Sequence, residues 1–119
     1  MTADSKKYDL EDRTYEFAKK VRVLVKVLSK TMGNFEDAKQ LIRSSGSIGA
    51  NYIEANEALS KKDFIMRAKI CRKEAKESLY WLKLIDVEGN PELEREIKVL
   101  QKEAKELTHI FGAIVTKSQ

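Results

Sequence analysis

The sequence predicts an all-α protein, an antiparallel up-and-down bundle of four helices, and three observations support this prediction. The chain has 119 residues with only five glycines and one proline, and 35% of its residues are charged. This composition is rich in helix formers. Apolar residues recur at helical spacing in four segments, and the short connections between the segments favour antiparallel neighbours in one domain.

The first helix is expected over residues 11–31, after a polar stretch, residues 1–9, that we expect to be flexible. Its apolar residues, spaced by three, four and seven, are Leu10, Phe17, Val21, Leu24 and Leu28. Gly33 is expected to end this helix as a left-handed cap, and Asn34 is expected to cap the next helix.

The second helix is expected over residues 35–59, although its centre, SSGSIGANY, has the composition of a loop. The apolar residues nevertheless keep helical phase through the glycines, and they are Leu41, Ile48, Tyr52 and Leu59. We therefore predict one continuous helix whose small residues Ser45, Gly46 and Gly49 let a neighbouring helix approach closely. The alternative is a helix that is broken near Gly46.

The last two helices are expected over residues 61–87 and 91–117. Ser60 has the position of an N-cap for the third helix, and Gly89 is expected to close it. The Asn-Pro pair at residues 90–91 supplies an N-cap and a first-turn proline for the fourth helix. Both segments carry one apolar stripe at spacings of three and four.

The residues that catalysis or metal binding would need are scarce. His109 is the only histidine, and no second histidine or cysteine lies near it at ligand spacing. Cys71 is the only cysteine and is expected to be a small core residue rather than a nucleophile. We therefore expect no enzyme activity, no metal and no cofactor. We also expect a cytoplasmic location and no membrane association, because no apolar run is long enough to span a bilayer.

A basic stripe is predicted on the third helix. Residues 61–76 carry seven basic and two acidic residues, and this local charge of +5 exceeds the net charge of +4 of the whole chain. On a helical projection, one arc of about 100° contains Lys62, Lys69, Arg72, Lys73, Lys76 and Lys83. We expect no aromatic residue within this arc. The stripe suits a phosphate backbone, and its simpler interpretation is a solvated face.

A second apolar row is predicted on the same helix, on the side opposite the basic stripe. It consists of Met66, Ile70, Trp81 and Leu84, flanked by Glu74 and Glu77. Four helices cannot easily cover this row within one chain. We therefore predict a homo-oligomer with Trp81 as an interface anchor.

A polar row is predicted on the second helix. Ser47, Asn51 and Glu54 lie at i, i+4 and i+7 beside the apolar stripe, with Arg67 or Arg72 as a charged partner for Glu54. An ordinary solvated face explains the same spacing equally well.

The run SSGSIGANYIEANEALSKKDFIMRAKICRKEAKESLYWLKLI resembles the signature of four-helix-bundle proteins encoded in intervening sequences of bacterial large-subunit (23S) ribosomal RNA genes. The matching residues are Ser47, Ile48, Ala50, Asn51 and Glu54, followed by Glu77 on the third helix. The resemblance implies a bundle that assembles as a homopentameric ring. It also implies similarity to the accessory variability determinant of diversity-generating retroelements, which binds nucleic acid and a reverse transcriptase.

Two functions are open at this point. The leading hypothesis is a non-enzymatic oligomer that binds the backbone of RNA or DNA through the basic stripe. The alternative is a protein–protein scaffold or adaptor with no nucleic-acid role, in which the same basic residues serve solubility. Nucleic-acid affinity that falls steeply with salt would favour the first hypothesis.

Overall fold

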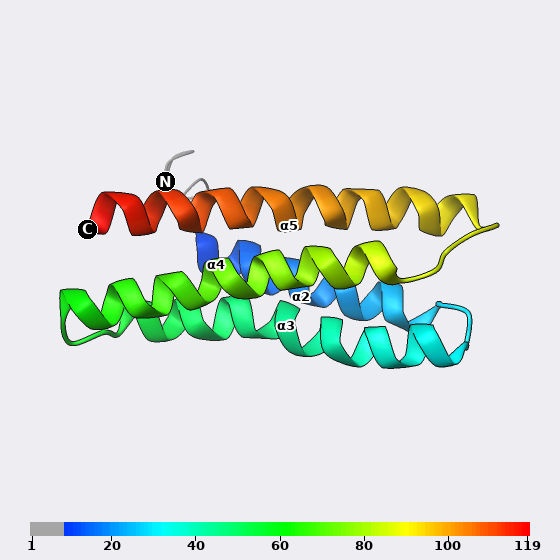
Figure 1. The fold of residues 1–119 in the computed structure, drawn as a ribbon, viewed down its shortest axis with the longest axis horizontal. Coiled ribbons are helices and arrows are strands. Elements are labelled where there is room, and N and C mark those ends of the chain that lie inside the picture. Colours follow the sequence, from blue (N-terminus) through cyan, green and yellow to red (C-terminus); the bar gives the residue numbers. More distant parts are fainter. Residues whose placement is uncertain (1–8) are drawn as a thin grey trace.

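The computed structural model describes residues 9–119, and within this range all regular structure is helical. The helices are α2 (Leu10–Lys26), α3 (Met32–Asn56), α4 (Lys61–Leu84) and α5 (Pro91–Ser118). Successive helices run in opposite directions and form an elongated bundle of 47 × 31 × 19 Å (Figure 1). The predicted all-α, up-and-down four-helix bundle is therefore confirmed.

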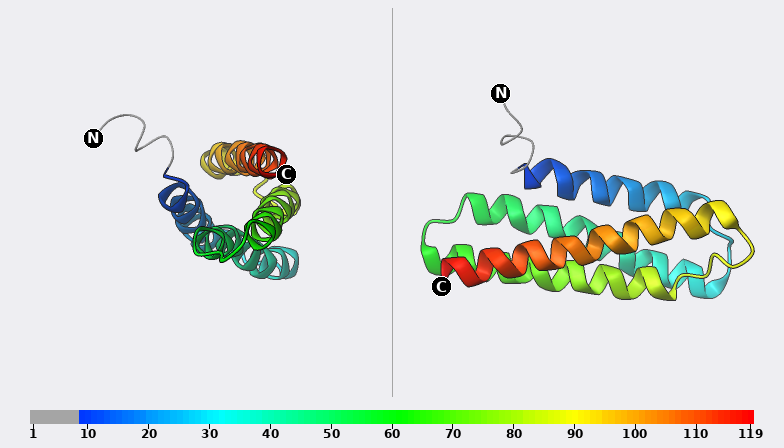
Figure 2. Two further views of the ribbon diagram at one scale, coloured as in Figure 1. Left: turned by 90° about the vertical axis from the view of Figure 1, so that its left-hand side faces the viewer. Right: turned by 90° about the horizontal axis from the view of Figure 1, so that it is seen from above.

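Each helix packs against the next one along the chain, and α2 shares a smaller contact with α5 (Figure 2). The core between the helices contains the fully buried side chains of Phe17, Leu41, Ile48, Leu82, Leu107 and Phe111. At the edge between α2 and α5, Arg13 donates two hydrogen bonds of 2.7 and 2.8 Å to Glu103 and one of 2.8 Å to Glu106. This cluster ties the first helix to the last.

The connection between α2 and α3 differs from the prediction. The first helix ends at Lys26 rather than at residue 31, and the second begins at Met32 rather than at residue 35. Thr31, not Asn34, is the N-cap, because its hydroxyl accepts a 3.1 Å hydrogen bond from the Asn34 amide. Gly33 lies in the first turn of α3 and is not left-handed, so it ends no helix.

Asn34 instead joins two connections that are distant in sequence. Its side-chain amide donates to the carbonyl oxygens of Ser29 at 3.1 Å and Asp86 at 3.0 Å, and its Oδ1 accepts from the Asp86 amide at 2.9 Å. The backbone turns extended at Ile85, so α4 ends at Leu84 and not at residue 87. Gly89 has a φ of +85° in the following turn, where glycine is favoured.

The second helix is continuous through its glycines, as predicted, and the alternative of a break near Gly46 is wrong. Gly49 lies against α2: a Cβ atom there would lie 2.9 Å from Thr14 Oγ1. The helix ends at Asn56 rather than at residue 59. Leu59, predicted in the apolar stripe, lies beyond the helix end and is 99% exposed.

The remaining helix ends follow local capping. Ser60 accepts from the Asp63 amide and Asn90 accepts from the Leu93 amide, as their predicted N-cap positions require. A flexible stretch was expected over residues 1–9. Asp9 is instead the N-cap of α2, and residues 1–8 lie outside the described range. Among residues 9–119, no helix combines the length and the apolar character needed to cross a bilayer.

Candidate functional site

The six residues of the predicted basic stripe all lie on α4 and are all exposed. Helix α4 packs into the bundle through small side chains, chiefly Ala68, Cys71 and Ala75. Within residues 9–119, none of the six basic side chains takes part in a salt bridge. Their charges are therefore available to a ligand of opposite charge.

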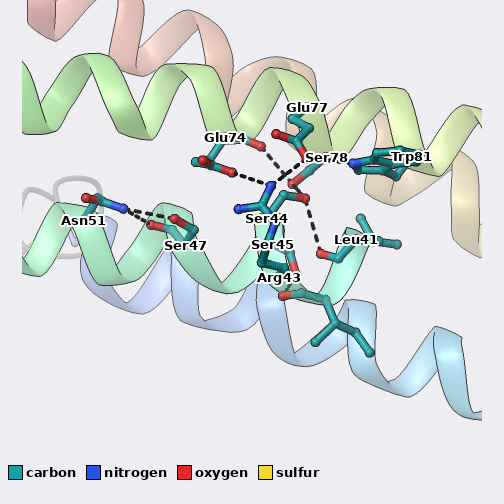
Figure 3. A network of polar contacts seen from close by, with 11 residues as sticks. Leu41, Arg43, Ser44, Ser45, Ser47, Asn51, Glu74, Glu77, Ser78 and Trp81 are labelled. Carbon is teal, nitrogen blue, oxygen red and sulfur yellow. Dashed lines mark hydrogen bonds and ion pairs between the residues drawn. The ribbon is translucent and has the colours of Figure 1, made fainter. Parts of the chain in front are cut away.

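Two acidic residues of α4, Glu74 and Glu77, pair with Arg43 of α3 (Figure 3). Arg43 Nη2 lies 2.6 Å from Glu77 Oε2 and 3.3 Å from Glu74 Oε1. Glu77 Oε2 also accepts a 2.9 Å hydrogen bond from Trp81 Nε1. The hydrogen bonds from Trp81 and Arg43 hold the pKa of the Glu77 carboxyl below its ordinary value. The ionised form of Glu77 is therefore favoured, and both carboxylates pair with Arg43.

Glu74 is the most buried charged residue of this network, with a side chain that is only 7% exposed. Its Oε1 atom has the ion pair with Arg43 but no hydrogen bond. A carboxylate in this environment depends on the opposite charge nearby. Arg43 therefore supplies the opposite charge that Glu74 needs across the α3–α4 contact, and sequence spacing within α4 gave no signal for it.

The apolar row of α4 borders the basic stripe and is not opposite to it. At roughly 100° per residue, the centres of the row and of the stripe are only about a quarter of a helical turn apart. Met66 and Leu84 are 46% and 49% exposed, and Ile70 and Trp81 are half-buried. The earlier placement on the opposite side is therefore wrong. The row lies beside the stripe and overlaps the Arg43 network, because Trp81 belongs to the row and donates to Glu77.

An aromatic residue does lie within the basic arc, contrary to expectation. Tyr80 is four residues after Lys76 and three before Lys83, so helix geometry places it on the same face. It is 56% exposed, and its ring meets that of Trp81 edge to face at 5.0 Å. The same helical projection that located the lysines could have found it.

The polar row of α3 joins α4 through a different partner than predicted. Asn51 Nδ2 donates to the backbone oxygen and the hydroxyl of Ser47 at 2.9 and 3.0 Å. Arg67 Nη1 then donates to Asn51 Oδ1 at 3.0 Å, so Arg67 binds Asn51 and not Glu54. Arg72 is not the partner either, since its Cδ lies towards Gly112 of α5. Glu54 is exposed.

Two buried groups beneath this row are structural. Ser44 and Ser78 have their hydroxyl oxygens 2.8 Å apart, and Ser78 donates to the Glu74 carbonyl. Cys71 is buried, and burial raises the pKa of its thiol to about 12. Across residues 9–119, no cluster of three or more His, Cys, Asp or Glu side chains is placed to hold a metal ion.

The family model described as 23S rRNA-intervening sequence protein matches residues 6–113. The chain belongs to this family. A solved structure supports the assignment: a protein of unknown function from the S23 ribosomal protein family of Bacteroides thetaiotaomicron VPI-5482 has 32% sequence identity and a TM-score of 0.74. The match covers 88% of this chain and 96% of that one. No curated protein matches the sequence.

Membership of the 23S rRNA-intervening sequence family gives the matched residues a structural context. Ser47 and Asn51 form the hydrogen-bonded row between α3 and α4, and Glu77 lies in the Arg43 network. These residues of the family signature therefore secure the contact that orients α4. The basic stripe and the apolar row lie on the free surface of that helix.

Proposed function

We propose that this 23S rRNA-intervening sequence protein is a non-enzymatic, self-assembling protein of the cytoplasm that binds nucleic acid through α4. The observation that carries the proposal is the set of six exposed, unpaired basic side chains on one face of a single helix, within the described range. Glu74 and Glu77 of the same helix pair with Arg43 of α3. A face with this charge attracts phosphate backbones irrespective of base sequence.

The proposal predicts a strong dependence of affinity on salt. Six phosphate contacts per copy correspond to a slope of about −5 in a plot of log affinity against log salt for a duplex. Affinity should vary little with base sequence, because the stripe has one exposed aromatic ring, Tyr80, and long cationic side chains that reach the backbone.

The test is filter binding of structured RNA and duplex DNA at low and moderate salt. The variant replaces Lys69, Arg72 and Lys73 by glutamate. The matched control replaces by glutamate Lys19, Lys20 and Lys26 of α2, which are also exposed and give the same change of net charge. We expect binding to be lost in the first variant and largely kept in the control. Absence of binding at low salt, or equal loss in both variants, would refute the proposal.

Self-assembly is the second part of the proposal, and the apolar row Met66, Ile70, Trp81 and Leu84 supports it. Two of these side chains are about half exposed, and hydrogen bonding to Glu77 holds the Trp81 ring in place. A rigid aromatic ring beside exposed aliphatic side chains has the character of an interface anchor. The family resemblance implies a ring of five copies.

Sedimentation of the wild type and of a Met66→Glu, Leu84→Glu variant tests this assembly. Both positions are exposed in the single chain, so the variant should fold and be a monomer. If the wild type is a monomer at micromolar concentration, the assembly proposal is wrong. The alternative function, a scaffold or adaptor for another protein, is favoured by the same apolar row. It gains support if assembly is intact while nucleic-acid binding is absent.

A further inference from the structure

Helix α5 borders the basic face of α4, and two contacts define how the two helices are aligned. Gln101 Nε2 donates to the Leu82 carbonyl at 3.3 Å. A Cβ atom at Gly112 would lie 3.7 Å from Arg72 Cδ. Because the helices are antiparallel, the turn of α5 between these contacts lies level with the turn of α4 around Leu79.

Lys105 of α5 lies in that turn, on the edge that faces α4. It is four residues after Gln101 and seven before Gly112, which places all three on one side of the helix. Lys98, seven residues earlier, lies on the same edge. Both lysines are exposed and, within residues 9–119, neither is in a salt bridge. The seam between the helices therefore carries lysines from both sides.

The lysines of α5 complete a row that α4 leaves interrupted. On α4, the positions nearest the seam are Arg72, Lys76 and Lys83, with apolar Leu79 between the last two. Lys105 lies level with that gap, and Lys98 continues the row beyond Lys83. The outer row of α4 consists of Lys62, Lys69 and Lys73. The surface thus has two cationic rows rather than one.

The dimensions of this surface fit a duplex. The stripe from Lys62 to Lys83 is about 31 Å long at roughly 1.5 Å per residue, close to one turn of about 34 Å in B-form DNA. The outer row of α4 and the two lysines of α5 lie on neighbouring helices, whose axes are typically about 8–10 Å apart. This spacing is comparable with the groove widths of about 6 and 12 Å in B-form DNA.

A single strand fits less well, because sites for single strands obtain much of their affinity from bases stacked on several aromatic rings, at about 1–3 kcal/mol each. Tyr80 is the exposed aromatic residue of the α4 face, and the seam-facing positions of α5 add Lys98 and Lys105 but no exposed Phe, Tyr or Trp. One ring can stack on one base. The surface therefore offers paired rows of charge with little stacking.

We propose that α4 and α5 together form a two-row cationic face that binds the paired phosphate backbones of a nucleic-acid duplex. This inference rests on the proposed nucleic-acid function and adds its ligand class and a second helix. Long side chains can contact the backbones of DNA and RNA duplexes alike, and the two are separate arms of the test.

The experiment measures fluorescence anisotropy with labelled DNA and RNA duplexes of about two turns, roughly 20 bp, and with their separated strands. We expect at least one duplex to bind about tenfold more tightly than its strands. Changing Lys98 and Lys105 to alanine removes two contacts and should lower the salt slope by about 2. Changing the same two residues to glutamate should weaken binding further.

The matched control changes Arg95 and Lys102 to alanine or glutamate. These residues are also exposed and lie seven apart on α5. Each is three residues before one of the test lysines, about 60° further round the helix from α4 at roughly 100° per residue, so their changes should lower the slope less. Tighter binding of single strands, or no effect of the Lys98 and Lys105 changes, overturns this inference while the nucleic-acid function stands. No binding of any probe at low salt overturns both.

Discussion

Replacement of Gly49 by alanine tests whether the small residues of α3 exist to let α2 approach. A Cβ atom at Gly49 would lie 2.9 Å from Thr14 Oγ1 and 3.4 Å from Thr14 Cβ. Thr14 is fully buried, and its hydroxyl donates to the carbonyls of Leu10 at 2.7 Å and Glu11 at 3.1 Å. The side chain cannot move aside without losing these hydrogen bonds.

The size of the effect follows from two opposing contributions. Alanine is favoured over glycine within a helix by about 1 kcal/mol, whereas overpacking of a tight core contact costs about 1–3 kcal/mol. We therefore expect Gly49→Ala to lower the free energy of unfolding by about 1 kcal/mol. Gly46 is the matched control, because its Cβ atom would meet only the end of the Arg22 side chain, at 3.5 Å. Gly46→Ala should raise stability by about 1 kcal/mol.

Urea unfolding followed by circular dichroism measures both variants, with the slope m compared to detect changes of the unfolded state. A second background, Thr14→Ala, removes the oxygen that a Cβ atom at position 49 would meet. In that background Gly49→Ala should become stabilising. Equal stabilisation by Gly46→Ala and Gly49→Ala in the wild type would show that close helix approach is not the reason for glycine at position 49.

Three further predictions concern single side chains. Asn34→Ala removes three hydrogen bonds between the two connections and should cost about 2–4 kcal/mol of unfolding free energy in urea; a loss below about 1 kcal/mol would contradict the bridging role. Glu77 has a lowered pKa, so its contribution to stability is present above its ordinary pKa of 4.5 and is lost as the pH falls. Glu77→Gln should therefore flatten the acid side of a plot of unfolding free energy against pH. An unchanged plot would contradict this prediction. The pKa of the Cys71 thiol is raised from 9.0 to about 12, which lowers its thiolate fraction about a thousandfold. A thiol reagent should therefore label Cys71 much more slowly in the native protein than in urea. Equal rates would show that the thiol is accessible.

The helices could be predicted from the sequence because their signals are local. The helical phase of Leu41 and Ile48 predicted a continuous α3 through the glycines. Ser60 and Asn90 were predicted as N-caps and cap α4 and α5. The errors lie where tertiary contacts decide the backbone. Asparagine is favoured at N-caps, yet Asn34 is buried between two connections. Local sequence patterns cannot predict its contact with Asp86, which is distant in sequence.

The site could be predicted only in part, for the same reason. Helical projection placed the six basic residues together because they share one helix. It could not find Arg43 or Lys105, because spacing within a helix does not reveal which neighbouring helix lies beside it. It also chose the wrong partner for Glu54, since Arg67 lies closer to Asn51 once α3 and α4 are packed.

The Arg43 network and the basic stripe are neighbours on the surface of α4. Lys73 contributes to the lowered pKa of Glu77, so the border between the acidic network and the stripe runs between these two residues. If Arg43 were absent, two carboxylates would be left without their ion-pair partner beside the stripe and would offset part of its charge. The single charge of Arg43 offsets one of these two negative charges from α3. The contact between α3 and α4 therefore also reduces the negative charge beside the basic stripe, and its disruption would weaken fold and charge together.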